Sequence, residues 1–260
     1  MWAARTKVAP MGTTVNTERI PRDVIVIGAS GGGIEAVREV LSHLPADLSA
    51  FVGVVIHRGA QSPANWSDML GSKTPLRVIE PAQGEALTRG IVYIAPSDCH
   101  MTFANGHVAL DRGPKQHHTR PAVDRLFTSA ALAYGPRLVG VVLTGGGEDG
   151  ARGLVAVTAA GGLALVQRPS DAEHPSMPFY AIARNHVCAE LNVGGLGAIL
   201  VQLAHGLAVP ILAADVPKPL PFPWGRILRS PRSLERSLRA HSRGKSRSAR
   251  QGWGDSTLVR

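Results

Sequence analysis

Three short segments of the sequence combine reactive side chains with glycine. Residues 28–32 read Gly-Ala-Ser-Gly-Gly, His57 follows a run of apolar residues, and Glu148 and Asp149 follow three glycines. A serine hydroxyl, an imidazole and a carboxylate are the nucleophile, general base and orienting group of acyl-transfer enzymes. The sequence therefore contains the side chains needed for ester or amide hydrolysis.

Ser30 lies in a segment that matches the G-x-S-x-G nucleophile elbow, in which a strand turns sharply into a helix. The apolar run 24–27 precedes it, and a helical pattern of apolar residues follows it. Such a turn exposes the hydroxyl at a helix N-terminus, which also favours a developing oxyanion. The same glycines fit a turn that binds a phosphate or a dinucleotide. The motif alone leaves both interpretations open.

His57 separates these alternatives. A dinucleotide-binding unit requires Asp or Glu at the end of its second strand, about 20 residues after the glycines, to bind the ribose hydroxyls. Here the second apolar run, 51–56, ends in His57 instead. A single histidine is often structural, but its place beside the first strand-to-helix turn favours a general base. We therefore predict that His57 activates Ser30.

Either Glu148 or Asp149 could orient the imidazole. Asp149 has the shorter side chain and lies between Glu148 and Gly150, so we predict it as the third catalytic residue. The alternative is a helix N-cap, a common role for an aspartate that precedes a helix. The order Ser, His, Asp differs from the Ser, Asp, His order of the α/β-hydrolase fold, which argues against a lipase-like enzyme.

The elements that must position these residues alternate between strands and helices. Apolar, β-branched runs predict strands at 24–27, 51–56, 76–79, 91–95, 138–143 and 163–166, and helical spacing predicts helices at about 34–44, 65–70, 123–133, 151–160 and 195–207. Asn105-Gly106 predicts a tight turn between strands 101–104 and 107–110. The fold class expected is therefore a doubly wound α/β domain with a mostly parallel sheet, one antiparallel hairpin and helices on both faces.

Composition and charge set further limits. Apolar residues make up 44% of the 260 residues and charged residues 18%, enough apolar material for a buried core. Two cysteines, no secretory signal pattern and no bilayer-length apolar run indicate a soluble, cytoplasmic protein. The formal net charge of +9 arises entirely from residues 216–260. The rest of the chain has no net charge, and so there is no electrostatic reason to expect it to bind nucleic acid.

We therefore expect three regions: a flexible N-terminal segment (1–22), a catalytic domain (23–215), and a proline-rich linker followed by a basic tail (216–260). The composition of the tail favours disorder. Its alternatives are a tether to an anionic membrane surface and non-specific binding to nucleic acid.

With these motifs in place, the segment from about Asp23 to Leu207 resembles the catalytic domain of chemotaxis-type (CheB-type) protein-glutamate methylesterases. The resemblance is carried by IGASGGG (27–33), VVIHRG (54–59) and LTGGGEDGARG (143–153), with YIAPSDCHM (93–101), RPAVDRLFTSAA (120–131) and SMPFYAI (176–182) between and after them. It implies hydrolysis of glutamyl γ-methyl esters on methyl-accepting chemotaxis-type receptors, in many members with deamidation of glutamines. It implies no cofactor.

The sequence departs from the family pattern in three places. Gly31 stands where the family usually has threonine, and Gly146 where it usually has methionine. The resemblance implies that Gly31 and Gly146 belong to the oxyanion and substrate loops, with most of the oxyanion stabilisation from the backbone N–H at position 146, where a more mobile glycine backbone would lower the rate. Only about 22 residues precede the first strand, so control by a receiver domain in the same chain is not expected. Two other functions remain as alternatives: a nucleotide- or phosphate-binding protein and an inactive receptor-docking scaffold.

The remaining polar clusters have weaker patterns. Asp98-Cys99-His100 and His117-His118 contain metal-ligand residue types but no metal-binding spacing, so we predict surface or loop roles and no metal. Three arginines, Arg120, Arg125 and Arg168, could contact an acidic receptor helix, but for each of them we favour a place on a solvated cationic face.

Overall fold

The computed structural model describes residues 20–60, 65–184, 187–207 and 209. They belong to a compact unit over residues 1–218, whereas the second unit, 219–260, lies wholly outside the described residues. Most of the predicted N-terminal segment and all of the predicted linker and tail are therefore outside them as well. No helix of the described part is long and apolar enough to cross a membrane.

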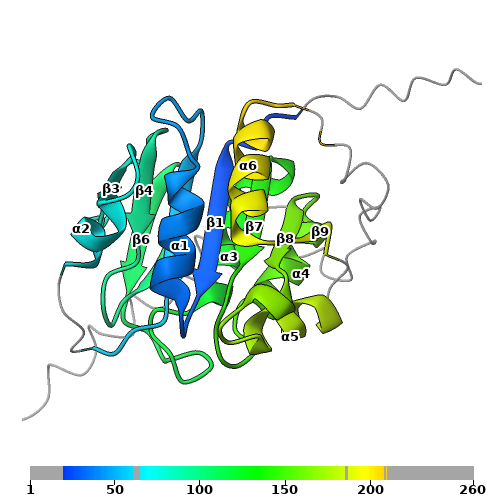
Figure 1. Cartoon of the computed structure of the whole chain (residues 1–260). Coiled ribbons are helices and arrows are strands. Elements are labelled where there is room, and N and C mark those ends of the chain that lie inside the picture. Colours follow the sequence, from blue (N-terminus) through cyan, green and yellow to red (C-terminus); the bar gives the residue numbers. More distant parts are fainter. Residues whose placement is uncertain (1–19, 61–64, 185–186, 208, 210–260) are drawn as a thin grey trace, which may run out of the picture. The chain divides into compact units, whose positions relative to one another are not determined.

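The main sheet is parallel and has seven strands in the order β3-β4-β2-β1-β7-β8-β9. Its strands are β1 (Val24–Ala29), β2 (Phe51–Ile56), β3 (Arg77–Ile79), β4 (Ile91–Ile94), β7 (Leu138–Val142), β8 (Leu163–Gln167) and β9 (Ala189–Leu191). β1 lies at the centre, between β2 and β7 (Figure 1). The chain moves outward on one side of β1 and then returns to continue on the other side. The switch point lies between β1 and β7, where doubly wound folds hold their ligands.

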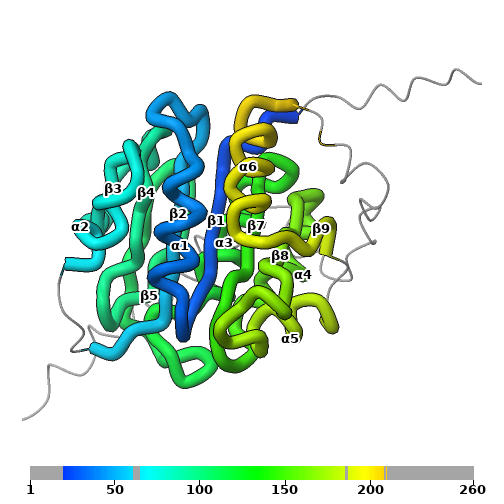
Figure 2. Tube along the Cα trace, viewed as in Figure 1, coloured from blue at the N-terminus to red at the C-terminus, as the bar shows by residue number. Residues whose placement is uncertain are grey.

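Helices cover both faces of this sheet, as the sequence predicts. They are α1 (Gly33–Ser42), α2 (Trp66–Gly71), α3 (Val123–Tyr134), α4 (Ala151–Ala159), α5 (Ser176–Arg184) and α6 (Val193–Ala204), with short 3₁₀ turns at Gly135–Arg137 and Pro169–Asp171. Helices α1, α2 and α6 share one hydrophobic core with the sheet, and α3, α4 and α5 share the other. Figure 2 shows α1 and α6 side by side in front of the sheet.

The central strands are buried on both faces, which explains their continuous apolar runs. Every residue of β1, β2, β7 and β8 is buried, with successive side chains entering opposite cores. Ile25 and Ile27 face the core of α1 and α6, whereas Val24 and Val26 face the core of α3. Because these strands are buried on both faces, their sequences are continuously apolar, as is typical of parallel sheets, and do not alternate between apolar and polar residues.

The structure differs from the predicted elements at three places. The hairpin strands β5 (His100–Ala104) and β6 (His107–Asp111) form a two-stranded sheet separate from the main one; it packs on α3, and Ala86 adds an isolated antiparallel bridge to His107. Strand β9 and helix α5 were not predicted, because β9 has three residues and the nine-residue α5 begins Ser-Met-Pro, where a proline disfavours the helical conformation of the residue before it. Helix α6 starts two residues earlier than predicted, where the Asn192 side chain accepts a hydrogen bond from Gly195 N–H.

Candidate active site

Ser30 and His57 follow two strands that are paired in register. Ala29 of β1 lies opposite Ile56 of β2, and the His57 N–H donates to the Ala29 carbonyl at 3.0 Å. The next residues on the two strands are therefore neighbours at the carboxyl edge of the sheet. Among the described residues no hydrogen bond joins the Ser30 hydroxyl to His57, although such bonds are often absent without substrate.

The turn that carries Ser30 is closed by the loop after β7. The Ser30 N–H donates to the Thr144 carbonyl at 3.0 Å, and the Gly33 N–H donates to the Ser30 carbonyl at 2.9 Å at the start of α1. Gly145 packs so closely that a Cβ there would lie 2.7 Å from Ser30 Cβ. Gly32 adopts a left-handed φ of 69°, which a residue with a side chain rarely does. The glycines therefore fix the serine in a sharp strand-to-helix turn.

His57 binds Asp149 through its Nε2 atom, at 2.7 Å from Asp149 Oδ2. The other ring nitrogen, Nδ1, is then the one left for Ser30. This is the reverse of the arrangement in chymotrypsin-like enzymes, in which Nδ1 faces the aspartate. Thr119, which no sequence motif marked, has its hydroxyl 3.4 Å from His57 Nε2 and donates to the Gln116 carbonyl.

Asp149 is 2% exposed and is held by backbone N–H groups from another helix. Its carboxylate accepts from the N–H groups of Val123, at 2.7 Å, and Asp124, at 2.9 Å, in the first turn of α3. Burial alone raises the pKa of a carboxyl group, but the hydrogen bond to His57 and those from the α3 backbone outweigh it and lower the pKa of Asp149. The carboxylate stays ionised, as an orienting group must.

A second histidine–aspartate pair lies against the first. His117 Nε2 is 3.0 Å from Asp124 Oδ2, and the other oxygen of Asp124 accepts from the N–H groups of Gly150 and Gly153. Burial and the neighbouring charge of Asp149 raise the pKa of Asp124. The two aspartates thus share a buried region, but the pKa of Asp124 is raised whereas that of Asp149 is lowered.

His117, Asp124 and Asp149 are the three described residues whose ligand atoms lie close enough to hold a metal ion, within 4.8 Å of one another. Each of their carboxylate oxygens already accepts at least one N–H hydrogen bond from the backbone or a histidine. The donor set therefore fits a hydrogen-bonded network better than a cation.

His100, expected at a surface or in a loop, is instead 1% exposed within β5, and its ring nitrogen Nε2 lies 3.0 Å from the Pro114 carbonyl oxygen.

The two candidate oxyanion positions differ in their surroundings. Within the described part of the chain, the N–H groups of Gly31 and Gly146 have no hydrogen-bond acceptor, so both remain available to a ligand. A Cβ at Gly31 would meet His174 Cδ2 at 2.6 Å, whereas nothing lies within 4 Å of one at Gly146. The His174 ring, which the sequence did not mark, thus occupies the space of a side chain at position 31.

Glu148 and the three selected arginines are all used in ion pairs. Glu148 pairs with Arg184, Arg120 with Asp98, Arg125 with Asp111, and Arg168 with Asp171. Of the two acids that the sequence offered, the structure brings Asp149 and not Glu148 to His57. Arg120 alone among these arginines lines a cavity that also contacts His57.

A doubly wound sheet with a serine turn and a histidine–aspartate pair at its carboxyl edge is the arrangement expected of a serine hydrolase outside the lipase-like fold. The family model of the CheB methylesterase matches residues 25–200. The chain therefore belongs to the CheB methylesterase family.

Individual relatives and a solved structure support the same family assignment. A relative from Leptospira interrogans is 34% identical over 182 residues, which are 70% of this chain and 94% of that protein. Protein-glutamate methylesterase FrzG of Myxococcus xanthus is 36% identical over 183 residues, covering 70% of this chain and 55% of FrzG. The chain spans about half the length of several such relatives. The crystal structure of the Thermotoga maritima CheB methylesterase catalytic domain matches 70% of this chain and 98% of that domain, with a TM-score of 0.67 and 31% identity.

Proposed function

We propose that this protein hydrolyses glutamyl γ-methyl esters on methyl-accepting chemotaxis-type receptors, releasing methanol and glutamate. Its relatives carry the name protein-glutamate methylesterase, several with protein-glutamine glutaminase added. The observation that carries the proposal is the 2.7 Å hydrogen bond between His57 and Asp149, made at the end of the strand that pairs with the Ser30 strand.

The mechanism we propose is acyl transfer in two steps. The Ser30 hydroxyl attacks the ester carbonyl while Nδ1 of His57 takes its proton, and the backbone N–H groups of Gly31 and Gly146 stabilise the oxyanion. Asp149 holds the proton on Nε2, so that Nδ1 presents its lone pair to the serine. The collapsing intermediate expels methanol, which takes the proton from His57. Water then hydrolyses the acyl-enzyme by the same route.

Deamidation of glutamine fits the same machinery. An amide replaces the ester, His57 protonates the departing ammonia, and the products are ammonia and glutamate. The relatives whose names include glutaminase support this second reaction. Comparing methanol and ammonia release from the same receptor, carrying either methyl glutamate or glutamine, measures both.

Methanol release from a methylated receptor of the source organism tests the proposal directly. Labelling with a serine-directed phosphonate tests the alternatives, because an activated Ser30 becomes covalently modified whereas a nucleotide- or phosphate-binding loop does not. Receptor binding without either reaction would leave only the docking scaffold and contradict the proposal.

We further propose that the protein acts in the cytoplasm, where receptor segments carrying such esters lie. Residues 216–260 hold eleven Lys and Arg but two acidic residues. This excess supports a contact between the tail and an anionic membrane surface near the receptors, to which each cation contributes about 1 kcal/mol.

A further inference from the structure

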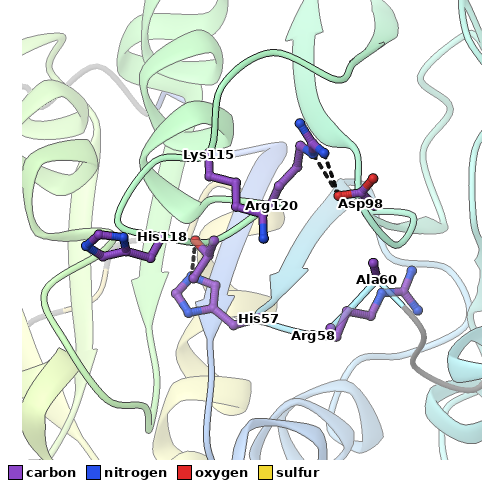
Figure 3. Close-up of a pocket in the computed structure, with 9 residues that line it drawn as sticks. His57, Arg58, Ala60, Asp98, Lys115, His118 and Arg120 are labelled. Carbon is purple, nitrogen blue, oxygen red and sulfur yellow. Dashed lines mark hydrogen bonds and ion pairs between the residues drawn. The ribbon is translucent and has the colours of Figure 1, made fainter.

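A polar cavity of about 290 Å³ lies beside His57. It is lined by His57, Arg58, Gly59, Ala60, Asp98, Lys115, His118, Thr119 and Arg120. Because it contacts the imidazole that would serve Ser30, a group bound there would lie next to the reacting ester. Figure 3 shows that the labelled side chains come from the end of β2, from the loop before β5 and from the loop between β6 and α3.

Two arginines of the cavity are already fixed by other groups. The Arg58 side chain is 1% exposed, stacks on Trp66 at 4.9 Å and donates to Glu80 and to the Ala95 carbonyl. Arg120 donates twice to Asp98, at 2.9 and 2.7 Å. These arginines form the wall of the cavity, but their charges are largely balanced.

Lys115 is different. It is exposed, and it has no ion pair or hydrogen bond with any of the residues that the structure describes. In Figure 3 its ammonium group reaches into the cavity, on the side of His57. It is therefore the cation of this cavity that remains available to a ligand.

The local charge balance is positive. The hydrogen bonds from Arg120 lower the pKa of Asp98. The charges of Arg112 and Lys115 act in the same direction. The charged residues that line the cavity are three cations, Arg58, Lys115 and Arg120, and one carboxylate, Asp98, so the cavity favours a second anionic group.

We infer that this cavity binds a carboxylate of the substrate, on a side chain near the methyl ester, with Lys115 as its counter-ion. The inference rests on the proposed function, because it assumes a peptide substrate whose ester reaches Ser30. Lys115 would then be a specificity-determining residue that selects esters in an acidic peptide. An exposed ion pair contributes up to about 1 kcal/mol, which corresponds to a preference of about fivefold.

Two peptides test this. Each carries one glutamate γ-methyl ester in the same helical sequence, with Glu four residues to either side in one peptide and Ala in the other. The wild-type chain should show a kcat/KM about two- to fivefold higher on the acidic peptide. The preference should vanish in Lys115→Gln and reverse in Lys115→Glu.

Lys73→Glu is the matched control, since Lys73 is exposed, lies outside the cavity lining and gives the same change in net charge. All variants keep the basic tail, so differences among them report the substituted site. Equal kcat/KM on both peptides, or a preference that survives in both Lys115 variants, would overturn the inference.

Binding measured without turnover separates this inference from the proposed function. Fluorescence anisotropy of the labelled acidic peptide should show weaker binding by Lys115→Glu than by Lys73→Glu. If that difference appears but no methanol is released from peptide or receptor, the carboxylate site stands and the methylesterase proposal fails. Equal binding by the two variants rejects the carboxylate site even if the protein proves to be an active esterase.

Discussion

At the scale of single residues, the proposed chemistry depends on which atoms face each other. The Nε2 atom of His57 binds Asp149 at 2.7 Å, so the base that would serve Ser30 is Nδ1. The oxyanion positions are backbone N–H groups, which do not depend on side-chain identity. We therefore expect a side chain at position 31 or 146 to affect activity only through the space that it occupies.

The predicted triad should act as a unit. Ser30→Ala and His57→Ala should each lower kcat for methanol release by about 10⁴-fold or more, and the double variant should be little worse, because either loss disables the same step. Asp149→Asn should cost less, since serine and base remain. Near wild-type esterase activity in Ser30→Ala would show that another residue is the nucleophile.

The two unusual glycines should respond differently to the side chains that the family usually has. Gly31→Thr should lower kcat/KM, because its Cβ would lie 2.6 Å from the His174 ring. Adding His174→Ala should restore activity by clearing that space. Gly146→Met, with nothing within 4 Å of its Cβ, should be tolerated. Assays of the three variants on one ester substrate check this, and a Gly31→Thr variant as active as wild type would mean that His174 does not restrict the turn.

At the scale of elements, two helices hold the acidic side of the site by capping each other. Asp149, just before α4, accepts N–H groups of Val123 and Asp124 in α3. Asp124 in turn accepts the N–H groups of Gly150 and Gly153 at the start of α4. The helix-capping role that competed with catalysis in the sequence is thus present as well: Asp149 caps α3, and at the start of α4, the helix that it precedes, it accepts the Gly150 N–H at 3.0 Å.

Asp124 should therefore affect both stability and pH dependence. Its raised pKa means that the folded state takes up a proton at a pH where the unfolded chain does not, so the free energy of unfolding should fall as pH rises through that window. Asp124→Asn keeps an acceptor oxygen without a charge. We expect it to remove this part of the pH dependence and to match or exceed wild-type stability at neutral pH.

Asp124→Ala removes the carboxylate that accepts the Gly150 and Gly153 N–H groups and so uncaps α4, which should lower the free energy of unfolding by about 1–2 kcal/mol. Urea unfolding of the wild type and both variants, from acidic to neutral pH, provides the measurement. Identical pH profiles for wild type and Asp124→Asn would contradict the assignment of a raised pKa to Asp124.

At the scale of the whole molecule, charge and chemistry occupy different parts of the sequence. Residues 1–215 hold equal numbers of basic and acidic residues, seventeen of each, whereas residues 216–260 carry the entire net charge of +9. A general electrostatic attraction to membranes or nucleic acid would therefore come from the tail, while selection of a substrate carboxylate would come from Lys115.

The tail should be what binds anionic vesicles. In co-sedimentation at low salt, the full chain should bind vesicles containing anionic lipid more strongly than a chain ending at Asp215, and added salt should weaken this binding. Neutral vesicles serve as the control. Equal binding of both chains, or binding by neither, would eliminate the membrane-tether proposal.

Much of this architecture follows from the sequence alone. Short, continuous apolar runs predicted the buried parallel strands, since a strand covered on both faces has apolar residues at successive positions and not at alternate ones. Because the carboxyl ends of such strands meet at one edge, Ser30, His57 and Asp149 could be selected before any coordinates. Two short elements lacked that signal, since β9 has three residues and α5 has a proline in its first turn.

Tertiary structure decided what depends on contacts between distant segments. It determined which ring nitrogen of His57 meets Asp149, placed the His174 ring over Gly31, and joined Asp124 to the helix that follows Asp149. It also brought Lys115, on a loop with no recognisable motif, to the cavity beside His57. Sequence periodicity reports whether a residue is buried, whereas the direction of a side chain and its partners are set only when loops far apart in the chain pack together.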